Sequence, residues 1–152
     1  MPESRQHVVT QALKTALETI ATGSGYFYDV NTVSTSFRSL LEGSDGIDLT
    51  IVQGPAKKSQ GPLNKWKVLQ EYEIIARVHV YSEADGTQYL NRVIADIEKA
   101  VLVDTQLGGV ACDTFLRGNE ILYTEHTDPI SIVKVDITVH FRHSYLDPTT
   151  DV

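Results

Sequence analysis

The longest regular alternation of apolar and polar side chains runs from Ser131 to His143. Every second residue in this stretch is apolar: Val133, Val135, Ile137, Val139 and Phe141. Because a β-strand turns successive side chains to opposite faces of its sheet, one face of this strand should rest on a core. The other face should meet water or a partner. The pattern therefore predicts a long strand in a half-buried sheet.

Two earlier strands are expected to pair as a hairpin. Ile47 to Val52 alternates over a short stretch, and Lys65 to Tyr81 alternates over a long one. Between them, Gln53 to Asn64 carries two Gly-Pro pairs, and proline cannot donate a hydrogen bond to a strand ladder. We therefore expect two antiparallel strands joined by a long exposed loop at residues 53–64.

Weaker strand signals occupy two other parts of the chain. The aromatic run Tyr26 to Val30 favours a strand whose rings are packing residues rather than a stacking surface for a ligand. Val110 to Arg117 and Glu120 to Thr124 are short strand candidates, separated by a turn or bulge signal at Gly118-Asn119. We interpret the polar segment Thr32 to Asp48 as a connection.

Apolar residues recur at helical spacing in two segments, Arg5 to Ala21 and Asp85 to Val101. One apolar stripe along each segment predicts a helix that covers a core. Ser82 is the candidate N-cap of the second helix. The polar residues expected on the exposed face of that helix are Asn91, Arg92, Asp96 and Lys99.

Together these elements predict one α+β domain over residues 1–152, with two helices packed on one face of a mainly antiparallel four- to five-stranded sheet. A chain of 152 residues can bury about two thirds of its unfolded surface, so it needs no covalent staple. Cys112 is the only cysteine, and we expect it to be a small buried residue. Residues from about 146 onward predict a flexible polar tail.

The chain carries no familiar catalytic or metal-binding motif. It contains no GxSxG, P-loop, GxGxxG or HExxH pattern. His140 and His143 should point to opposite faces of the long strand and so cannot share one ion. His79 could share the polar face with His140, although a solvated face is the more economical interpretation. We therefore expect no enzyme activity, no metal and no cofactor.

Charge and hydropathy argue against two classes of partner. The formal net charge of −7 leaves little basic surface for neutralising the phosphates of a nucleic acid. No apolar run approaches the roughly 18 residues of a membrane span. The N-terminal stretch MPESRQHVV lacks the basic and apolar segments of a signal peptide. We expect no membrane partner and no specific binding of DNA.

The order of these elements resembles that of the tail terminator proteins of tailed bacteriophages, including the minor tail protein U group. The likeness includes the Lys65 to Tyr81 strand with the helix that follows it, and the ending VDITVHFRHSYLDP from Val135 to Pro148. It implies a structural virion protein that caps the tail tube as a ring and joins it to the head or neck connector. No functional residue is carried over individually, because the family offers no catalytic motif.

The resemblance also implies partners and a location. The partners are further copies of the chain in a ring, most simply a hexamer, together with the tail tube protein and a head-tail connector or neck protein. The protein would be found in the virion tail or neck, and in the host cytoplasm during assembly. DNA would pass through the ring without specific binding, along an acidic lining. The alternatives are a neck or head-tail joining protein of similar fold and a small ligand-binding module with a closed pocket.

Four of the thirteen Lys and Arg residues lie in or beside the predicted 53–64 loop: Lys57, Lys58, Lys65 and Lys67. In an isolated monomer these lysines would be the solvated tip of a hairpin. In a ring of acidic subunits, the loop could become ordered as its lysines meet acidic groups on a neighbour or on the tube. We therefore expect the four lysines to form an intersubunit or tube contact.

Overall fold

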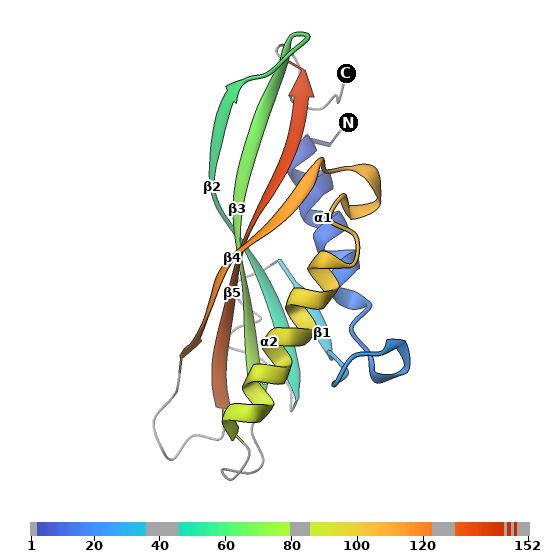
Figure 1. Cartoon of the computed structure of the whole chain (residues 1–152), viewed down its shortest axis with the longest axis vertical. Coiled ribbons are helices and arrows are strands. Elements are labelled where there is room, and N and C mark those ends of the chain that lie inside the picture. The colour runs from blue at the N-terminus through green and yellow to red at the C-terminus, as the bar shows by residue number, and fades with distance from the viewer. Residues whose placement is uncertain are drawn as a thin grey trace.

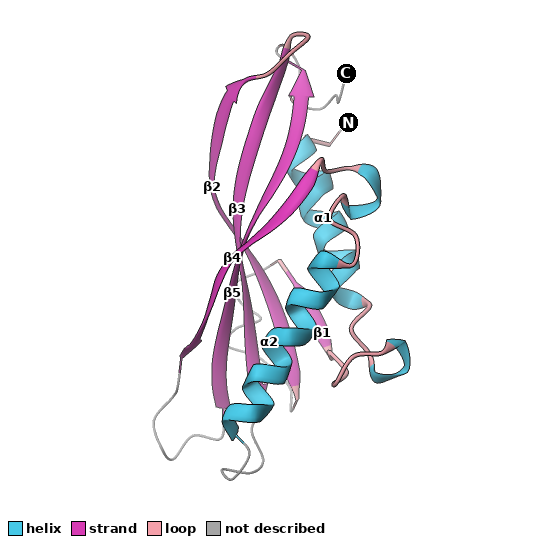
Figure 2. Cartoon of the chain, in the orientation of Figure 1, coloured by secondary structure: helices cyan, strands magenta, loops and turns pink. Residues whose placement is uncertain are grey.

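The structure is a computed structural model that describes residues 3–35, 46–79, 86–122 and 130–144, together with Leu146 and Pro148. Its elements follow in the order α1 (Arg5–Glu18), η1 (Thr22–Ser24), β1 (Thr32–Ser34), β2 (Ile47–Gln60), β3 (Lys65–His79), α2 (Gly86–Leu102), η3 (Leu107–Gly109), β4 (Asp113–Leu122) and β5 (Ile130–Ser144). Figures 1 and 2 show the two long helices beside one strongly twisted sheet. The predicted α+β class is confirmed.

All five strands join one sheet in the order β1-β2-β3-β5-β4. β1 is parallel to β2, and the other neighbouring strands are antiparallel. β3 and β5 pair from Lys65 opposite Ser144 to His79 opposite Ile130, which is the full length of both strands. The two strands with the longest alternation are therefore neighbours at the centre of the sheet.

One face of the sheet and the apolar stripes of both helices share a single buried core. On β5, every second residue from Val133 to Phe141 is fully buried, and β3 is buried in the same way from Val68 to Val78. The helices contribute Val9, Leu13 and Leu17 from α1, and Leu90, Val93, Ile94, Ile97 and Val101 from α2. Removing apolar surface from water, at about 25 cal/mol per Å², is the main source of stability for such a core.

The predicted long loop at residues 53–64 is wrong. β2 continues through Gln60, and its ladder with β3 ends only at the pair Gln60 and Trp66. The turn from Gly61 to Asn64 is the only part of this segment outside the strands. Gly54-Pro55 interrupts the ladder as a β-bulge instead of ending it. A proline is tolerated there because β2 is an edge strand along this stretch.

Gln70 compensates for the backbone hydrogen bonds that the bulge removes. This side chain is fully buried on β3. Its Nε2 donates to the carbonyl oxygens of Gly54 at 2.6 Å and Glu71 at 3.0 Å. Its Oε1 accepts a hydrogen bond of 2.9 Å from Nε2 of Gln6 on α1. A buried amide with such partners is satisfied, so the bulge also fastens α1 to the sheet.

The predicted aromatic strand at Tyr26–Val30 is also wrong, because this segment is a loop. The backbone N–H groups of Phe27 and Tyr28 donate to the two carboxylate oxygens of Asp96 on α2, each at 3.0 Å. Asp96 is only 4% exposed, although we predicted it on the open face of the helix. The carboxylate supplies the acceptors that a neighbouring strand would otherwise provide.

β4 is one strand where two short strands were predicted. The register shift between Leu116 and Gly118 shows that the Gly118-Asn119 signal marks a bulge and not a turn. The helix boundaries lie within three residues of the predicted ones. The predicted N-cap Ser82 and most of the predicted tail from residue 146 lie outside the described residues.

Candidate functional site

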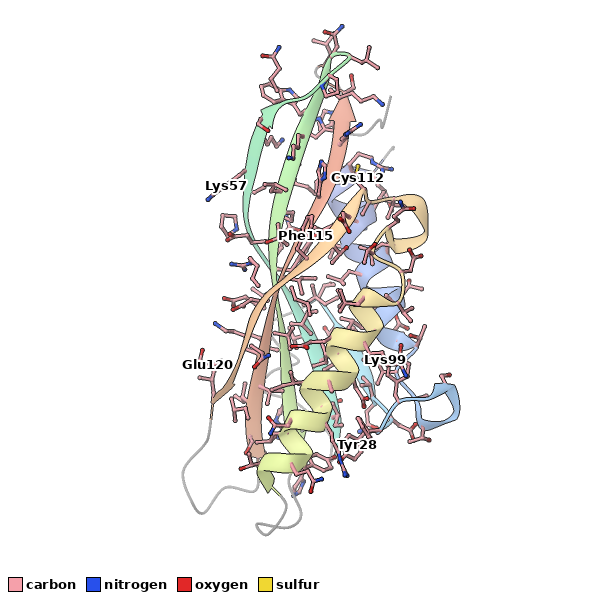
Figure 3. The ribbon with its side chains drawn as sticks, in the orientation of Figure 1. Tyr28, Lys57, Lys99, Cys112, Phe115 and Glu120 are labelled. Atoms are coloured by element: carbon pink, nitrogen blue, oxygen red, sulfur yellow. The ribbon has the colours of Figure 1, made fainter. Side chains whose placement is uncertain are left out.

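The four predicted contact lysines lie together at one end of the sheet, on the paired ends of β2 and β3. Lys57 and Lys58 are exposed on β2, while Lys67 is exposed and Lys65 half-buried on β3. Figure 3 shows Lys57 projecting outward from the edge of β2. The structure therefore places all four lysines at the same end of the sheet, on hydrogen-bonded strands and not on a loop, with Lys58 on the opposite face from the other three.

β5 adds a fifth cation to this end of the sheet, because Arg142 lies directly opposite Lys67. We call Lys57, Lys58, Lys65, Lys67 and Arg142 the basic tip. Within the described part of the chain, none of the five forms an ion pair. Like charges directly opposite each other on neighbouring strands are destabilising. The tip thus gathers five of the thirteen Lys and Arg residues without neutralising them.

Arg142 was missed as a member of the tip because only strand register brings it beside the lysines. The alternation from Ser131 to His143 did place it on the polar face. No property of the sequence, however, fixes which residue of β3 lies opposite a residue of β5. That information comes from the ladder, in which Lys67 pairs with Arg142.

His143 lies on the core side of the same strand and is 5% exposed. Its Nδ1 is 2.7 Å from the carbonyl oxygen of Ser144, an acceptor, so Nδ1 carries the proton. Its Nε2 is then free to accept from Nζ of Lys58 at 3.1 Å. This contact orients one lysine of the basic tip against the sheet.

His140 lies on the opposite face of β5 from His143, as predicted, next to Leu69 and Asp113 on the neighbouring strands. Its pKa is lowered by burial and by the positive charges of Lys67 and Arg142, with Asp113 acting in the other direction. The potential of the basic tip therefore extends to the next row of side chains.

His79 shares this face with His140 but lies at the far end of the sheet. It pairs with Ile130, and ten residues along β5, or about 33 Å, separate that position from His140. The two histidines cannot hold one ion. The described residues contain no group of three or more His, Cys, Asp or Glu side chains placed to bind a metal.

Acidic side chains occupy the middle of the sheet face that carries His140. We call Glu71, Glu73, Glu120 and Asp136 the acidic band. Glu71 lies 3.6 Å from Arg117. Lys134 lies 3.6, 3.8 and 3.9 Å from the other three carboxylates. Among the described residues, the ion pairs of these four carboxylates involve two cations, Arg117 and Lys134. Figure 3 shows Glu120 on the β4 side of the band.

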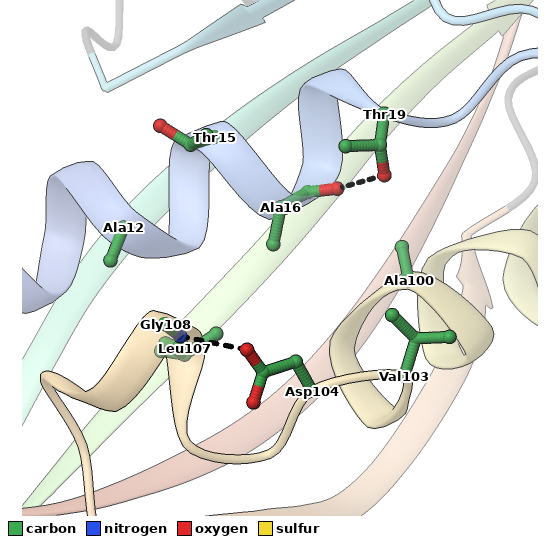
Figure 4. Close-up of a pocket in the computed structure, with 9 residues that line it drawn as sticks. All are labelled: Ala12, Thr15, Ala16, Thr19, Ala100, Val103, Asp104, Leu107 and Gly108. Carbon is green, nitrogen blue, oxygen red and sulfur yellow. Dashed lines mark hydrogen bonds between the residues drawn. The ribbon is translucent and has the colours of Figure 1, made fainter.

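An open apolar groove of about 470 Å³ lies between α1 and the segment that follows α2. It is lined by Ala12, Thr15, Ala16, Thr19, Ala100, Val103, Asp104, Leu107 and Gly108. Figure 4 shows Ala12 and Ala16 of α1 facing Leu107 and Val103 across this space. The Asp104 carboxylate is fixed there, since it accepts backbone N–H groups of Gln106 at 3.1 Å and Gly108 at 2.8 Å.

Cys112 is exposed, so the prediction that it is a buried residue is wrong. It precedes β4 directly, and its backbone N–H donates to the carbonyl oxygen of His140 at 2.7 Å. The side chain of the preceding residue, Ala111, is the one that enters the core. The thiol therefore takes no part in core packing.

No protein-family model matches the chain, and no curated protein matches it in sequence. Neither described helix is long and apolar enough to cross a membrane.

Proposed function

We propose that this protein is a non-catalytic virion subunit, which forms a ring on the end of a phage tail tube and joins it to the head or neck connector. The observation that carries the proposal is the uneven charge along one long sheet, with the basic tip at one end and the acidic band in the middle. A ring subunit must bind neighbours and at least one other partner through different surfaces. Separate surfaces of opposite charge meet that requirement and also fix orientation.

The basic tip is the proposed contact with an acidic surface on a neighbouring subunit or on the tube. Its five cations have no ion-pair partner within the described residues. An acidic partner would offset the repulsion between Lys67 and Arg142. Its binding to the tip would therefore be more favourable than its binding to a neutral surface. In Figure 1 the β2–β3 hairpin extends past the N-terminal end of α1, where it is accessible to a partner.

The acidic band is the proposed lining of the passage for DNA. Carboxylates repel phosphates, so a lumen lined by Glu71, Glu73 and Asp136 would let a duplex pass without holding it. This places the sheet face opposite the helices toward the ring axis. A ring whose lumen proved strongly basic would contradict this orientation.

Electron microscopy of the purified protein, alone and mixed with tails that lack their cap, tests the proposed function. We expect rings on the free ends of the tails, and native mass spectrometry should give the mass of a closed oligomer, with a hexamer expected. A protein that stays monomeric at all concentrations and never decorates tails would contradict the proposal. A neck or head-tail joining protein would instead decorate isolated head connectors and leave tails bare.

One observation favours a small ligand-binding module as a second candidate. The groove of about 470 Å³ falls in the size range of small-ligand sites, which is about 300–1,000 Å³. Such a module predicts a monomer whose melting temperature rises with an apolar ligand, because binding only the folded state stabilises it. The groove is open to solvent, whereas sites for small ligands enclose most of the ligand surface.

A further inference from the structure

The apex of the β2–β3 hairpin holds an apolar side chain in an unfavourable backbone conformation. Leu63 and Asn64 both have a φ of 57°. They turn the chain between Gly61 and Lys65, which are joined by an N–H···O bond of 2.8 Å. A turn with two left-handed central residues favours Asn or Asp followed by Gly, because a Cβ is strained there. Leu63 therefore destabilises the turn that contains it.

Leu63 is also 87% exposed. Lys65 follows it by two residues, and Lys58 lies a few residues before it on the facing strand. An exposed apolar side chain between two strands that carry lysines has the composition of a small protein contact, in which an anchor is desolvated and a polar rim surrounds it. A residue that costs the hairpin stability and faces water indicates a role outside the isolated subunit.

The groove between α1 and the segment after α2 has the complementary chemistry. Its α1 wall consists of Ala12 and Ala16 with two threonines, so a partner can approach the helix closely. Val103 on the opposite wall is apolar and 73% exposed. Asp104 supplies a fixed carboxylate beside this apolar surface. Lysines that flank an entering leucine would find a counter-charge there.

The apex cannot reach the groove of its own subunit. Gln6, in the first turn of α1, contacts Gln70 below the tip. The groove residues of α1, from Ala12 to Thr19, lie six to thirteen residues further along the helix, or about 9–20 Å, and the hairpin extends the opposite way (Figure 1). The apex and the groove are therefore two different surfaces that only separate copies can join.

We infer that the apex of one copy, anchored by Leu63, docks in the groove between α1 and the segment after α2 of a neighbouring copy. This inference rests on the proposed ring and names both sides of its subunit contact. A contact between two different surfaces is head-to-tail, and such contacts close into a ring when the rotation between copies allows it.

Leu63→Asn separates the docking role from a structural one. Asparagine tolerates the left-handed conformation, so the urea midpoint of unfolding should rise. Self-association, followed by sedimentation over a range of protein concentrations, should weaken at least tenfold because the anchor is lost. The variant should therefore be more stable than the parent but associate more weakly. Association as strong as that of the parent would overturn the inference.

Thr15→Trp tests the groove from the other side. Thr15 is exposed on the groove wall, so an indole there fills the space without entering the core. Association should weaken as it does for Leu63→Asn. The matched control is Glu18→Trp, which places the same indole at an exposed position of α1 outside the groove. It should leave association unchanged. If Thr15→Trp prevents binding of an apolar dye but not association, the groove is a ligand site and the inference is wrong.

Cross-linking tests the pairing of the two surfaces directly. With Cys112→Ser as background, Leu63→Cys combined with Thr15→Cys should give a ladder of oxidised oligomers on a non-reducing gel. Leu63→Cys combined with Glu18→Cys should not. Rings that form on tails without this cross-link would overturn the docking contact and leave the proposed function standing. A parent protein that never associates and never decorates tails would overturn both.

Discussion

Three buried polar side chains join parts of the molecule that backbone hydrogen bonds leave separate. Gln70 connects the β2 bulge to α1, and Asp96 connects the Tyr26–Val30 loop to α2. Tyr72 completes the set, with its hydroxyl 2.8 Å from that of Thr10 on α1. Buried polar groups with all their partners fix one arrangement of elements, because any other arrangement leaves them unsatisfied.

Tyr72 predicts a specific loss of stability at alkaline pH. Burial raises its pKa from 10.0 to about 12, against the hydrogen bond with Thr10, which lowers it. The unfolded chain therefore releases this proton first, so the stability from the neutral phenol is present below pH 10 and is lost as pH rises toward 12. Two pKa units correspond to about 3 kcal/mol.

Urea unfolding at a series of pH values from 8 to 12 measures this loss, with Tyr72→Phe as the comparison. The phenylalanine variant should lose about 1 kcal/mol at neutral pH, where its hydrogen bond to Thr10 is missing. Its stability should then fall less steeply than that of the parent above pH 10. Parallel curves would show that Tyr72 ionises equally easily in both states.

At the scale of elements, the sequence predicted the strands whose burial is one-sided. β3 and β5 rest on the core over most of their length, and burial of one face imposes alternation on their side chains. The end of β2 has no such constraint. Its residues from Lys57 to Gln60 are exposed on both faces, so their composition does not differ from that of a loop. Their order comes from pairing with β3, which is a long-range contact.

The Tyr26–Val30 error has a different cause. Aromatic residues favour strands by packing on a pleated surface, but that preference is weak and tertiary contacts override it. Here a carboxylate from α2 satisfies two N–H groups, and Tyr28 stacks on Tyr89 with ring centroids 4.4 Å apart. The only sequence signal for this contact was Asp96 itself. In the sequence, a buried aspartate in a helix looks the same as an aspartate on its exposed face.

Asp96 should therefore be essential to the junction between the loop and α2. Asp96→Ala removes the acceptor of two partly buried backbone N–H groups, so we expect a loss of about 1–3 kcal/mol. Denaturant unfolding measures it. Asn91→Ala, at an exposed position of the same helix, is the control and should change stability by no more than about 0.5 kcal/mol. Equal effects at the two positions would refute the role of Asp96.

The two faces of β5 should respond oppositely to a charge. Ile137 is fully buried, so Ile137→Asp places an unpaired carboxylate in the core and should cost about 4 kcal/mol or more. Thr138 lies on the other face, opposite Glu71, and Thr138→Asp should leave the domain folded. Circular dichroism during heating distinguishes the two outcomes. A folded Ile137 variant together with an unfolded Thr138 variant would reverse the assignment of the faces.

At the scale of the whole molecule, one end of an acidic protein is basic. The chain carries a net charge of −7, yet its hairpin end gathers five cations that form no ion pair within the described residues. Burial, together with the charges of Lys67 and Arg142, lowers the pKa of His140 on the neighbouring row. An isolated subunit gains nothing from this repulsion. A partner with acidic groups would offset the repulsion among these cations, bind more tightly for that reason, and dock in one orientation.

Reversing charge at the basic tip should therefore weaken assembly more than folding. In the double variant Lys57→Glu and Lys58→Glu, both changes are at exposed positions, so the domain should stay folded, with a loss of about 1–3 kcal/mol for the missing hydrogen bond from Lys58 to His143. Capping of tails, counted in electron micrographs, should fall well below that of the parent. The difference should be greatest at low ionic strength, because salt screens exposed charges over about 10 Å at 0.1 M.

The control for this double variant is Lys14→Glu with Lys99→Glu, which changes net charge equally but alters the two helices. If the effect arises from overall charge, both double variants should cap tails equally poorly. If it arises from the tip, only the Lys57 and Lys58 variant should fail, and raising the salt concentration should reduce the capping by the parent toward the same level. A Lys57 and Lys58 variant that caps tails as well as the parent at every salt concentration would show that the tip only closes the hairpin.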